Sequence, residues 1–102
     1  ESGACLMVGL DCHTADLAEQ TGPAAFEFCK RIIDDTKHVA AGYKPNSAFF
    51  ERLGPAGIQA LDDVIAYIPK SIPVLLDAKR GDIGSTCDAY AEAAFQAHKV
   101  RV

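Results

Sequence analysis

The sequence predicts an α/β fold in which strands alternate with helices and pair in parallel. Three observations support this prediction. Apolar or largely apolar runs of strand length occur at residues 5–10, 38–43 and 72–76, as expected for strands that are covered on both faces. Segments with helical spacing follow each run, and this order favours right-handed crossovers between parallel strands. Charged residues end each run, at the position where parallel α/β folds bind their ligands.

The first unit joins its apolar run to a helix through a polar, loop-like segment at residues 12–21. Thr21 fits the N-cap position, and Gly22 and Pro23 open the helix, with the proline in the first turn. Apolar residues recur at helical spacing to about Lys37, where we expect the helix to end.

The second unit contains a strand and two helices. Pro45 cannot donate a hydrogen bond to a ladder, so we expect the strand to stop there. Residues 47–53 predict a short helical turn. Gly54 and Pro55 break this turn and start a longer helix, whose apolar stripe ends at Pro69.

A third helix is predicted after the last apolar run. Gly81 and Gly84 let the chain turn, and Ser85 or Thr86 can cap the helix that follows. An alanine-rich segment predicts that this helix extends to about Lys99.

The carboxyl ends of the three runs carry charges of alternating sign. Asp11 follows the first run and Lys44 the second, and the third ends in the pattern Asp-x-Lys-x-x-Asp, made by Asp77, Lys79 and Asp82. Successive strand residues point to opposite faces, so Asp77 and Lys79 share a face. An exposed charge at one strand end is usually a solvated loop residue, and an ordinary salt-bridge network is the alternative here. Charges at three successive strand ends favour a chemical site.

Composition and charge argue against several classes of protein. The net charge of −4 gives no indication of a basic surface that would bind nucleic acid. No apolar run approaches the roughly 20 residues of a membrane span. The first residues lack the positive region of a secretory signal. The cysteines form no Cys-x-x-Cys pair, so we expect buried or half-buried thiols in a reducing cytosol, with a metal site or disulfide framework as the alternative. They are Cys5, Cys12, Cys29 and Cys87.

Three segments carry a resemblance to a known family. They are Val-Gly-Leu-Asp at 8–11, Tyr-Lys-Pro-Asn-Ser-Ala-Phe-Phe at 43–50, and Leu-Asp-Ala-Lys-Arg-Gly-Asp-Ile-Gly-Ser-Thr at 76–86. In order and spacing, the sequence resembles the orotidine 5′-phosphate decarboxylases, and the likeness extends to about residue 97. It is most similar to the branch with Lys-Pro-Asn and Asp-Ala-Lys-Arg-Gly-Asp. The third segment is highly specific, whereas the first is weak by itself.

The resemblance implies a fold and an activity. Residues 1–102 would be the N-terminal part of a (β/α)8 TIM barrel, with three parallel βα units present. A barrel of this kind needs about 250 residues. The implied enzyme is a cytoplasmic homodimer that needs no cofactor and converts orotidylate to UMP and CO2 in pyrimidine synthesis. We expect little or no activity from these residues alone, because the phosphate-binding loops of the family come from later strands.

The resemblance also implies roles for particular residues. Lys79 would be the proton donor, beside Asp77 and within a charged array. Asp11 would contact the substrate ribose, and Asn46 is a candidate for a further hydrogen bond to the substrate. The region around Asp82 would reach into the site of the partner subunit. The implied catalytic set is Lys44, Asp77, Lys79 and Asp82, and the implied substrate-binding set is Asp11, Asn46, Ile83 and Thr86.

Two other interpretations stay open. Related decarboxylases and aldolases of sugar phosphates also carry Asp-x-Lys-x-x-Asp, and many use a magnesium ion held by acidic residues. The Lys-Pro-Asn and Arg-Gly-Asp-Ile-Gly contexts favour the orotidylate enzyme over them. The third interpretation is a non-catalytic remnant that binds a partner or nothing.

Overall fold

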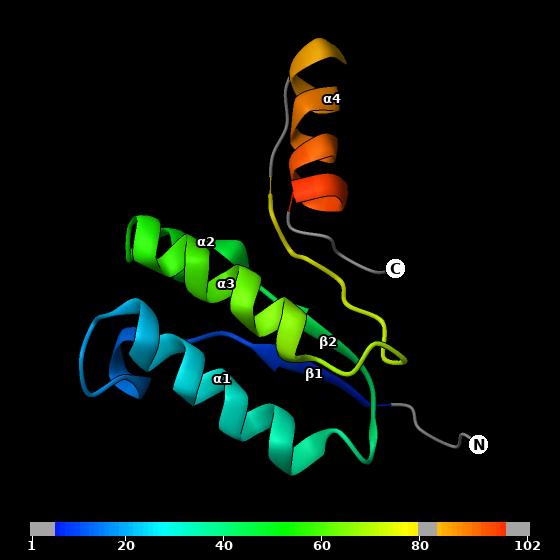
Figure 1. Cartoon of the computed structure of the whole chain (residues 1–102). Helices are drawn as coiled ribbons and strands as arrows, with labels where there is room; N and C mark the ends of the chain where they lie inside the picture. Colours follow the sequence, from blue (N-terminus) through cyan, green and yellow to red (C-terminus); the bar gives the residue numbers. More distant parts are fainter. Residues whose placement is uncertain (1–5, 80–83, 98–102) are drawn as a thin grey trace.

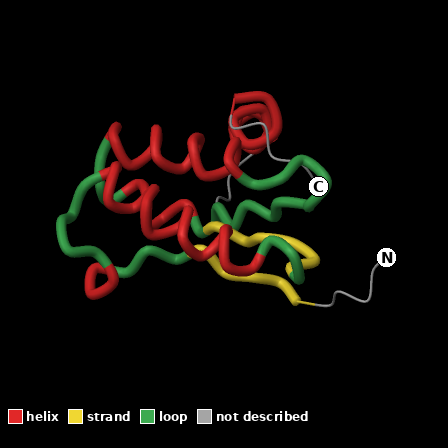
Figure 2. The backbone as a smooth tube through the Cα atoms, turned by 60° about the horizontal axis from the view of Figure 1, so that its bottom comes forward, coloured by secondary structure: helices red, strands yellow, loops and turns green. Residues whose placement is uncertain are grey.

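The computed structural model of the chain describes residues 6–79 and 84–97 and contains the predicted alternation of strands and helices (Figure 1). The helices α1 and α3 lie on one side of the strands, as Figure 2 shows, and the opposite side of the strands is open. The elements in chain order are β1 (Leu6–Leu10), a 3-10 turn (Thr14–Asp16), α1 (Gly22–Thr36), β2 (Ala40–Pro45), α2 (Ser47–Glu51), α3 (Pro55–Tyr67), α4 (Gly84–Glu92) and the π-helical turn η2 (Ala93–Ala97).

The strands β1 and β2 pair in parallel, as predicted, with Gly9 opposite Lys44. The third apolar run lies on the other side of β2 and also pairs in parallel, but through isolated bridges at Val74 and Asp77. The third predicted strand therefore pairs in parallel, as expected, but its ladder is interrupted within the described residues. The reason is Pro45. The amide of Asp77 donates to its carbonyl at 2.9 Å, but proline has no N–H to return to the facing chain, so the ladder is interrupted there.

The helix α1 begins and ends where the sequence predicts. Thr21 is the N-cap, and its hydroxyl accepts a hydrogen bond from the amide of Ala24 at 3.2 Å. The helix ends at Thr36, with Lys37 as the C-cap. Its buried face packs against the strands and α3, and contains Gly22, Ala25, Cys29 and Ile33.

The helices α2 and α3 form a compact pair behind β2. Gly54 has φ 76°, a left-handed conformation that favours glycine, and it separates the two helices. Gly57 lets α3 approach α2 closely, because a Cβ there would overlap the carbonyl oxygen of Phe50. The buried face of α3 consists of Gly57, Ala60, Leu61, Val64 and Ile65.

The core lies between the strands and the helices. Tyr43 is fully buried, and its hydroxyl lies 2.7 Å from Thr36 Oγ1 and donates to the carbonyl of Ile33 at 3.3 Å. Phe50 is also fully buried. Both aromatic residues therefore pack in the core.

The helix α4 stands apart from this two-layer part of the chain, and its C-terminal end lies nearest to α2 and α3 (Figure 1). There Tyr90 and Ala94 line a small cavity together with Glu51 and Ile58. The described residues of this helix are Gly84–Glu92, so Ser85 and Thr86 are both helical, and the prediction that one of them caps the helix is wrong. None of its residues is buried, which fits its alanine-rich and polar sequence. No helix in the described part of the chain is both long and apolar enough to cross a membrane.

Candidate active site at the strand ends

Alternation along the strands divides their side chains between two faces. Leu10, Tyr43 and Val74 are fully buried on the face that the helices cover. Met7 and Leu75 are 49% and 46% exposed on the opposite face. Side chains two or four positions further along the same strand point to this open face as well. Residues that pair with them on the neighbouring strand also belong to it. The candidate site residues on this face are Asp11, Lys44, Asn46, Asp77 and Lys79.

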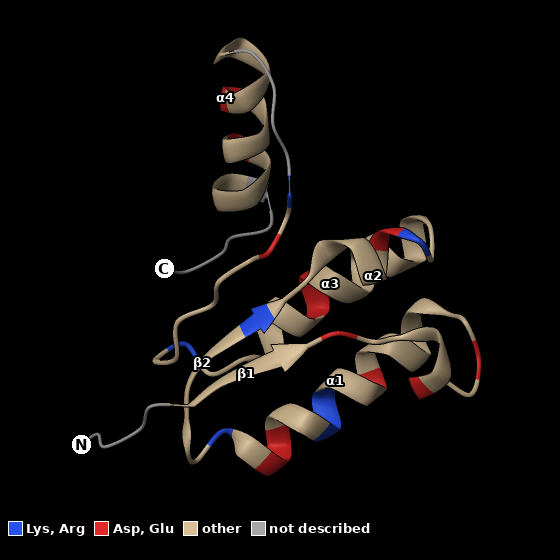
Figure 3. Cartoon of the chain, turned by 180° about the vertical axis from the view of Figure 1, so that it is seen from behind, with Lys and Arg blue, Asp and Glu red and all other residues tan. Residues whose placement is uncertain are grey.

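Figure 3 shows charged positions just beyond the end of β1, within the end of β2 and on the connection toward α4. Lys79 Nζ donates to both carboxylate oxygens of Asp77, at 3.0 and 3.1 Å. The prediction that the two side chains lie side by side is therefore confirmed. The main chain of Asp77 is also held at both ends: its amide donates to Pro45, and its carbonyl accepts from Ser47 at 3.0 Å.

Lys44 and Asn46 come from the end of β2, the central of the three paired segments. Lys44 is half-buried and pairs with Gly9 of β1, while Asn46 is bridged to Asp77. The structure places Lys44 and Asp77 on one face, and within the described residues no ion pair joins them. The Asn46 side-chain oxygen accepts from the amide of Ala48 at 3.0 Å, and Asn46 thereby caps α2.

Asp11 lies just beyond β1, and its Oδ1 atom is buried without a hydrogen-bond partner within the part of the chain that the structure describes. Buried polar atoms are normally paired, so an unpaired carboxylate oxygen needs an explanation. A ligand that donates hydrogen bonds at the strand ends is one explanation that agrees with the position of Asp11.

The described contacts do not bring the other three predicted residues to this group. Asp82 and Ile83 lie outside the described residues. Thr86 is half-buried in the first turn of α4. No described contact brings Thr86 to the pair of Asp77 and Lys79.

Arg52 was not among the predicted site residues, yet it joins two of the elements that carry them. Its Nη2 atom donates to the carbonyl of Cys12 at 2.7 Å, and its Nη1 atom donates to Gln20 Oε1 at 2.9 Å. The side-chain amide of Gln20 donates in turn to Thr14 O and Leu17 O, at 3.1 and 3.3 Å. Nothing in the local sequence signals this arrangement, because the strongest contact is to a backbone carbonyl 40 positions away.

The cysteines only partly match their prediction. Cys12 and Cys29 are buried thiols, as predicted, whereas Cys87 is exposed and Cys5 lies outside the described residues. The hydrogen bond with Cys29 lowers the pKa of Cys12. The same contact, together with burial, raises the pKa of Cys29. Among residues 6–79 and 84–97, no group of three His, Cys, Asp or Glu side chains could hold a metal ion.

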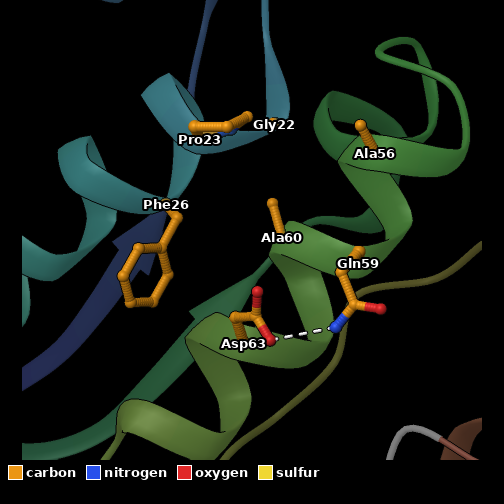
Figure 4. Close-up of a pocket in the computed structure, with 7 residues that line it drawn as sticks. All are labelled: Gly22, Pro23, Phe26, Ala56, Gln59, Ala60 and Asp63. Atoms are coloured by element: carbon orange, nitrogen blue, oxygen red, sulfur yellow. Dashed lines mark hydrogen bonds between the residues drawn. The ribbon is translucent and has the colours of Figure 1, made fainter.

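A separate groove of about 320 Å³ lies between the first turns of α1 and α3, in the helix layer (Figure 4). Its polar side chains, Gln59 and Asp63, are joined by a hydrogen bond of 3.0 Å. The other lining residues are Gly22, Pro23, Phe26, Ala56 and Ala60. This groove contains none of the predicted site residues.

Parallel βα units with charged side chains at the carboxyl ends of the strands fit one part of an α/β barrel. Residues 5–102 match the Orotidine 5'-phosphate decarboxylase / HUMPS family, and the chain belongs to this family. The resemblance inferred from the three sequence segments is thereby confirmed.

Individual proteins agree with this assignment. The orotidine 5′-phosphate decarboxylase of Herpetosiphon aurantiacus is 53% identical over 93 residues, which cover 88% of this chain and 35% of that protein. A Toxoplasma gondii structure assigned as an orotidine-monophosphate decarboxylase has 59% identity and a TM-score of 0.91, covering 93% of this chain and 33% of the other. The Leishmania donovani OMP decarboxylase has 52% identity and a TM-score of 0.84, with 93% and 36% coverage. The chain thus spans about a third of the length of these relatives.

Proposed function

We propose that these residues form the charged part of the active site of an orotidine 5′-phosphate decarboxylase, which converts orotidylate to UMP and CO2 without a cofactor. The observation that carries the proposal is the two-oxygen contact of Lys79 with Asp77 on the open face of the strands. Membership of the family and the names of the compared relatives support it.

Lys79 is the residue to which we assign the central chemical role. When the bond between C6 and the carboxylate breaks, CO2 leaves and the electron pair stays on C6 of the pyrimidine. A positioned ammonium stabilises this carbanion, and each ~1.4 kcal/mol of barrier reduction is worth tenfold in rate. The ammonium then transfers its proton to C6 to give UMP, and the neutral amine takes a proton from solvent.

The neighbouring charges hold Lys79 ready for this role. The carboxylate of Asp77 holds the Lys79 amino group on the open face through two hydrogen bonds, at 3.0 and 3.1 Å. We assign Lys44 and Asp82 to the same charged array. Asp77 would lie near the carboxylate that leaves as CO2.

Binding of the nucleotide is assigned to the surrounding residues. The Oδ1 atom of Asp11, which has no hydrogen-bond partner among residues 6–79 and 84–97, supports a role in accepting hydrogen bonds from the ribose hydroxyls. We assign a further hydrogen bond with the substrate to Asn46, whose backbone is bridged to Asp77. Ile83 and Thr86 would belong to a shared site in a homodimer. We propose that residues 1–102 act as part of a complete (β/α)8 barrel in the cytoplasm.

Orotidylate turnover tests the proposal in two forms of the protein. One is the chain itself. The other, called here the complete barrel, joins these residues to the remaining residues of the Herpetosiphon aurantiacus relative. We expect turnover by the complete barrel, little or none by the chain, and no change when metal is chelated.

Other outcomes would support the alternatives. Magnesium-dependent turnover of a keto-sugar phosphate, without turnover of orotidylate, would favour a sugar-phosphate lyase. Absence of turnover, together with no heat on titration of the complete barrel with millimolar UMP, would favour a non-catalytic remnant.

A further inference from the structure

The helix α2 is bonded to both neighbouring segments that carry candidate carboxylates. At its N-terminal end, the amide of Ser47 donates to the carbonyl of Asp77 at 3.0 Å. At its C-terminal end, Arg52 donates to the carbonyl of Cys12, the residue after Asp11, at 2.7 Å. The helix and Arg52 therefore link the backbone of Cys12, next to Asp11, to the backbone of Asp77, and we call this link the bracket.

The loop after β1 depends on this bracket for its position. Arg52 donates to Gln20 near the far end of the loop, and Gln20 bonds two carbonyls inside it. The ring of His13 lies 4.4 Å from that of Phe49 in α2, and Cys12 Sγ donates to the Phe49 carbonyl at 3.7 Å. Of these contacts, the Arg52 bond to Cys12 is the shortest, and it is charge-assisted, which makes it the strongest kind.

We infer that Arg52 is a positioning residue that fixes Asp11 relative to Asp77 and Asn46. This inference rests on the proposed function, because it concerns how the same site receives its nucleotide. Asp11 and Asp77 carry like charges, and Asp11 has no partner at Oδ1 within the described residues, so local contacts do not hold its carboxylate. The guanidinium supplies the constraint from outside the site through two fixed hydrogen bonds.

Substitution of Arg52 should affect binding more than chemistry. A contact to the ribose is the same in the ground state and the transition state, so its loss raises KM and leaves kcat nearly unchanged. In the complete barrel we expect Arg52→Met to raise KM by about tenfold, which corresponds to about 1.4 kcal/mol of binding free energy, with kcat changed less than about twofold. Arg52→Lys, which retains the charge, should recover part of the affinity.

Hydrogen exchange on the chain itself gives a readout that does not require activity. Arg52→Met and, more weakly, Gln20→Ala should speed amide exchange in residues 12–21 while leaving β2 unchanged. Arg31→Met, at an exposed position of α1, is the matched control and should change neither exchange nor KM. Arg52→Met that behaves like Arg31→Met would overturn the inference, as would faster loop exchange with an unchanged KM. If the unsubstituted complete barrel does not turn over orotidylate, the proposed function has failed, and exchange alone decides whether Arg52 holds the loop.

Discussion

Lys79 Nζ contacts both carboxylate oxygens of Asp77, yet the two side chains differ greatly in exposure. The Lys79 side chain is 85% exposed, whereas that of Asp77 is 22% exposed. Asp77 is further anchored by its main chain to Pro45 and Ser47. The carboxylate is therefore the more buried and better anchored member of the pair, and it holds the exposed Lys79 side chain on the open face.

This asymmetry separates the role of Lys79 in catalysis from its role in folding. Exposed ion pairs contribute only about 0–1 kcal/mol, so Lys79→Met should change the free energy of unfolding by no more than about 0.5 kcal/mol. The same substitution should lower kcat of the complete barrel by at least about 100-fold, because a preorganised charge is lost. Steady-state kinetics and urea unfolding measure the two effects. Lys70→Met, another exposed lysine, is the control for both, and substantial activity in Lys79→Met would refute its role as proton donor.

Much of the fold could be predicted because its signals are local. The cap at Thr21 and the end of α1 near Lys37 depend on residues a few positions apart. The shared face of Asp77 and Lys79 follows from strand alternation. The interruption of the third strand was missed because Pro45 removes a donor from a ladder whose other side lies far along the chain.

The candidate site divides in the same way. Its charged residues were predicted because they stand in motifs at strand ends. Arg52 and Gln20 were not, because they act through backbone carbonyls, and a carbonyl has no sequence signature. The cap of α4 was predicted wrongly because Ser85 and Thr86 are residue types that favour the N-cap position. In the structure both lie within the helix.

Tyr67 and Asp34 join α3 to α1, and their bond predicts a pH dependence of stability. The hydrogen bond from Tyr67 lowers the pKa of Asp34, and it raises the pKa of Tyr67. A lowered carboxyl pKa stabilises the fold above the unfolded value, and this contribution is lost as pH falls through the folded value. A raised phenol pKa stabilises the fold below the unfolded value near 10.0, and this contribution is lost as pH rises through the folded value.

Tyr67→Phe should therefore lower Tm at neutral pH, with a difference from the unsubstituted chain that shrinks in acid below the ordinary carboxyl range and again in strong alkali. Thermal unfolding followed by circular dichroism across pH measures this difference. Asp34→Asn removes the same titration and should give a matching acid profile. A Tm difference that stays constant down to acid pH would show that Asp34 does not report on this bond.

Thiol pKa and solvent exposure predict different orders of reactivity for the cysteines. We expect exposure to determine which cysteine reacts first. The lowered pKa of Cys12 favours its thiolate, but Cys12 and Cys29 are 0% exposed, whereas Cys87 is exposed. Alkylation requires a thiolate that the reagent can reach. Brief treatment of the native chain with iodoacetamide should label Cys87 well before Cys12 or Cys29, as read by site-resolved mass spectrometry. In urea the three should react at similar rates, and rapid native labelling of Cys12 would mean that the β1 end opens easily.

The close approach of α3 to α2 at Gly57 predicts that a larger residue there destabilises the chain. The helix α2 lies between its N-cap Asn46 and its C-cap Arg52. Alanine has the higher helix propensity, by about 1 kcal/mol, and in an open helix Gly→Ala would stabilise. Here the added Cβ would overlap the Phe50 carbonyl oxygen and lie 2.7 Å from Leu53 Cβ, so α2 would have to shift. Overpacking costs about 1–3 kcal/mol, and we expect Gly57→Ala to destabilise the chain by this amount in urea unfolding.

Gly9→Ala is the matched control, since no atom lies within 4 Å of its added Cβ and its stability should stay close to that of the unsubstituted chain. Equal stability of the two variants would mean that α2 can move without cost, and the bracket between Asp11 and Asp77 would then lack the rigid support that α3 provides.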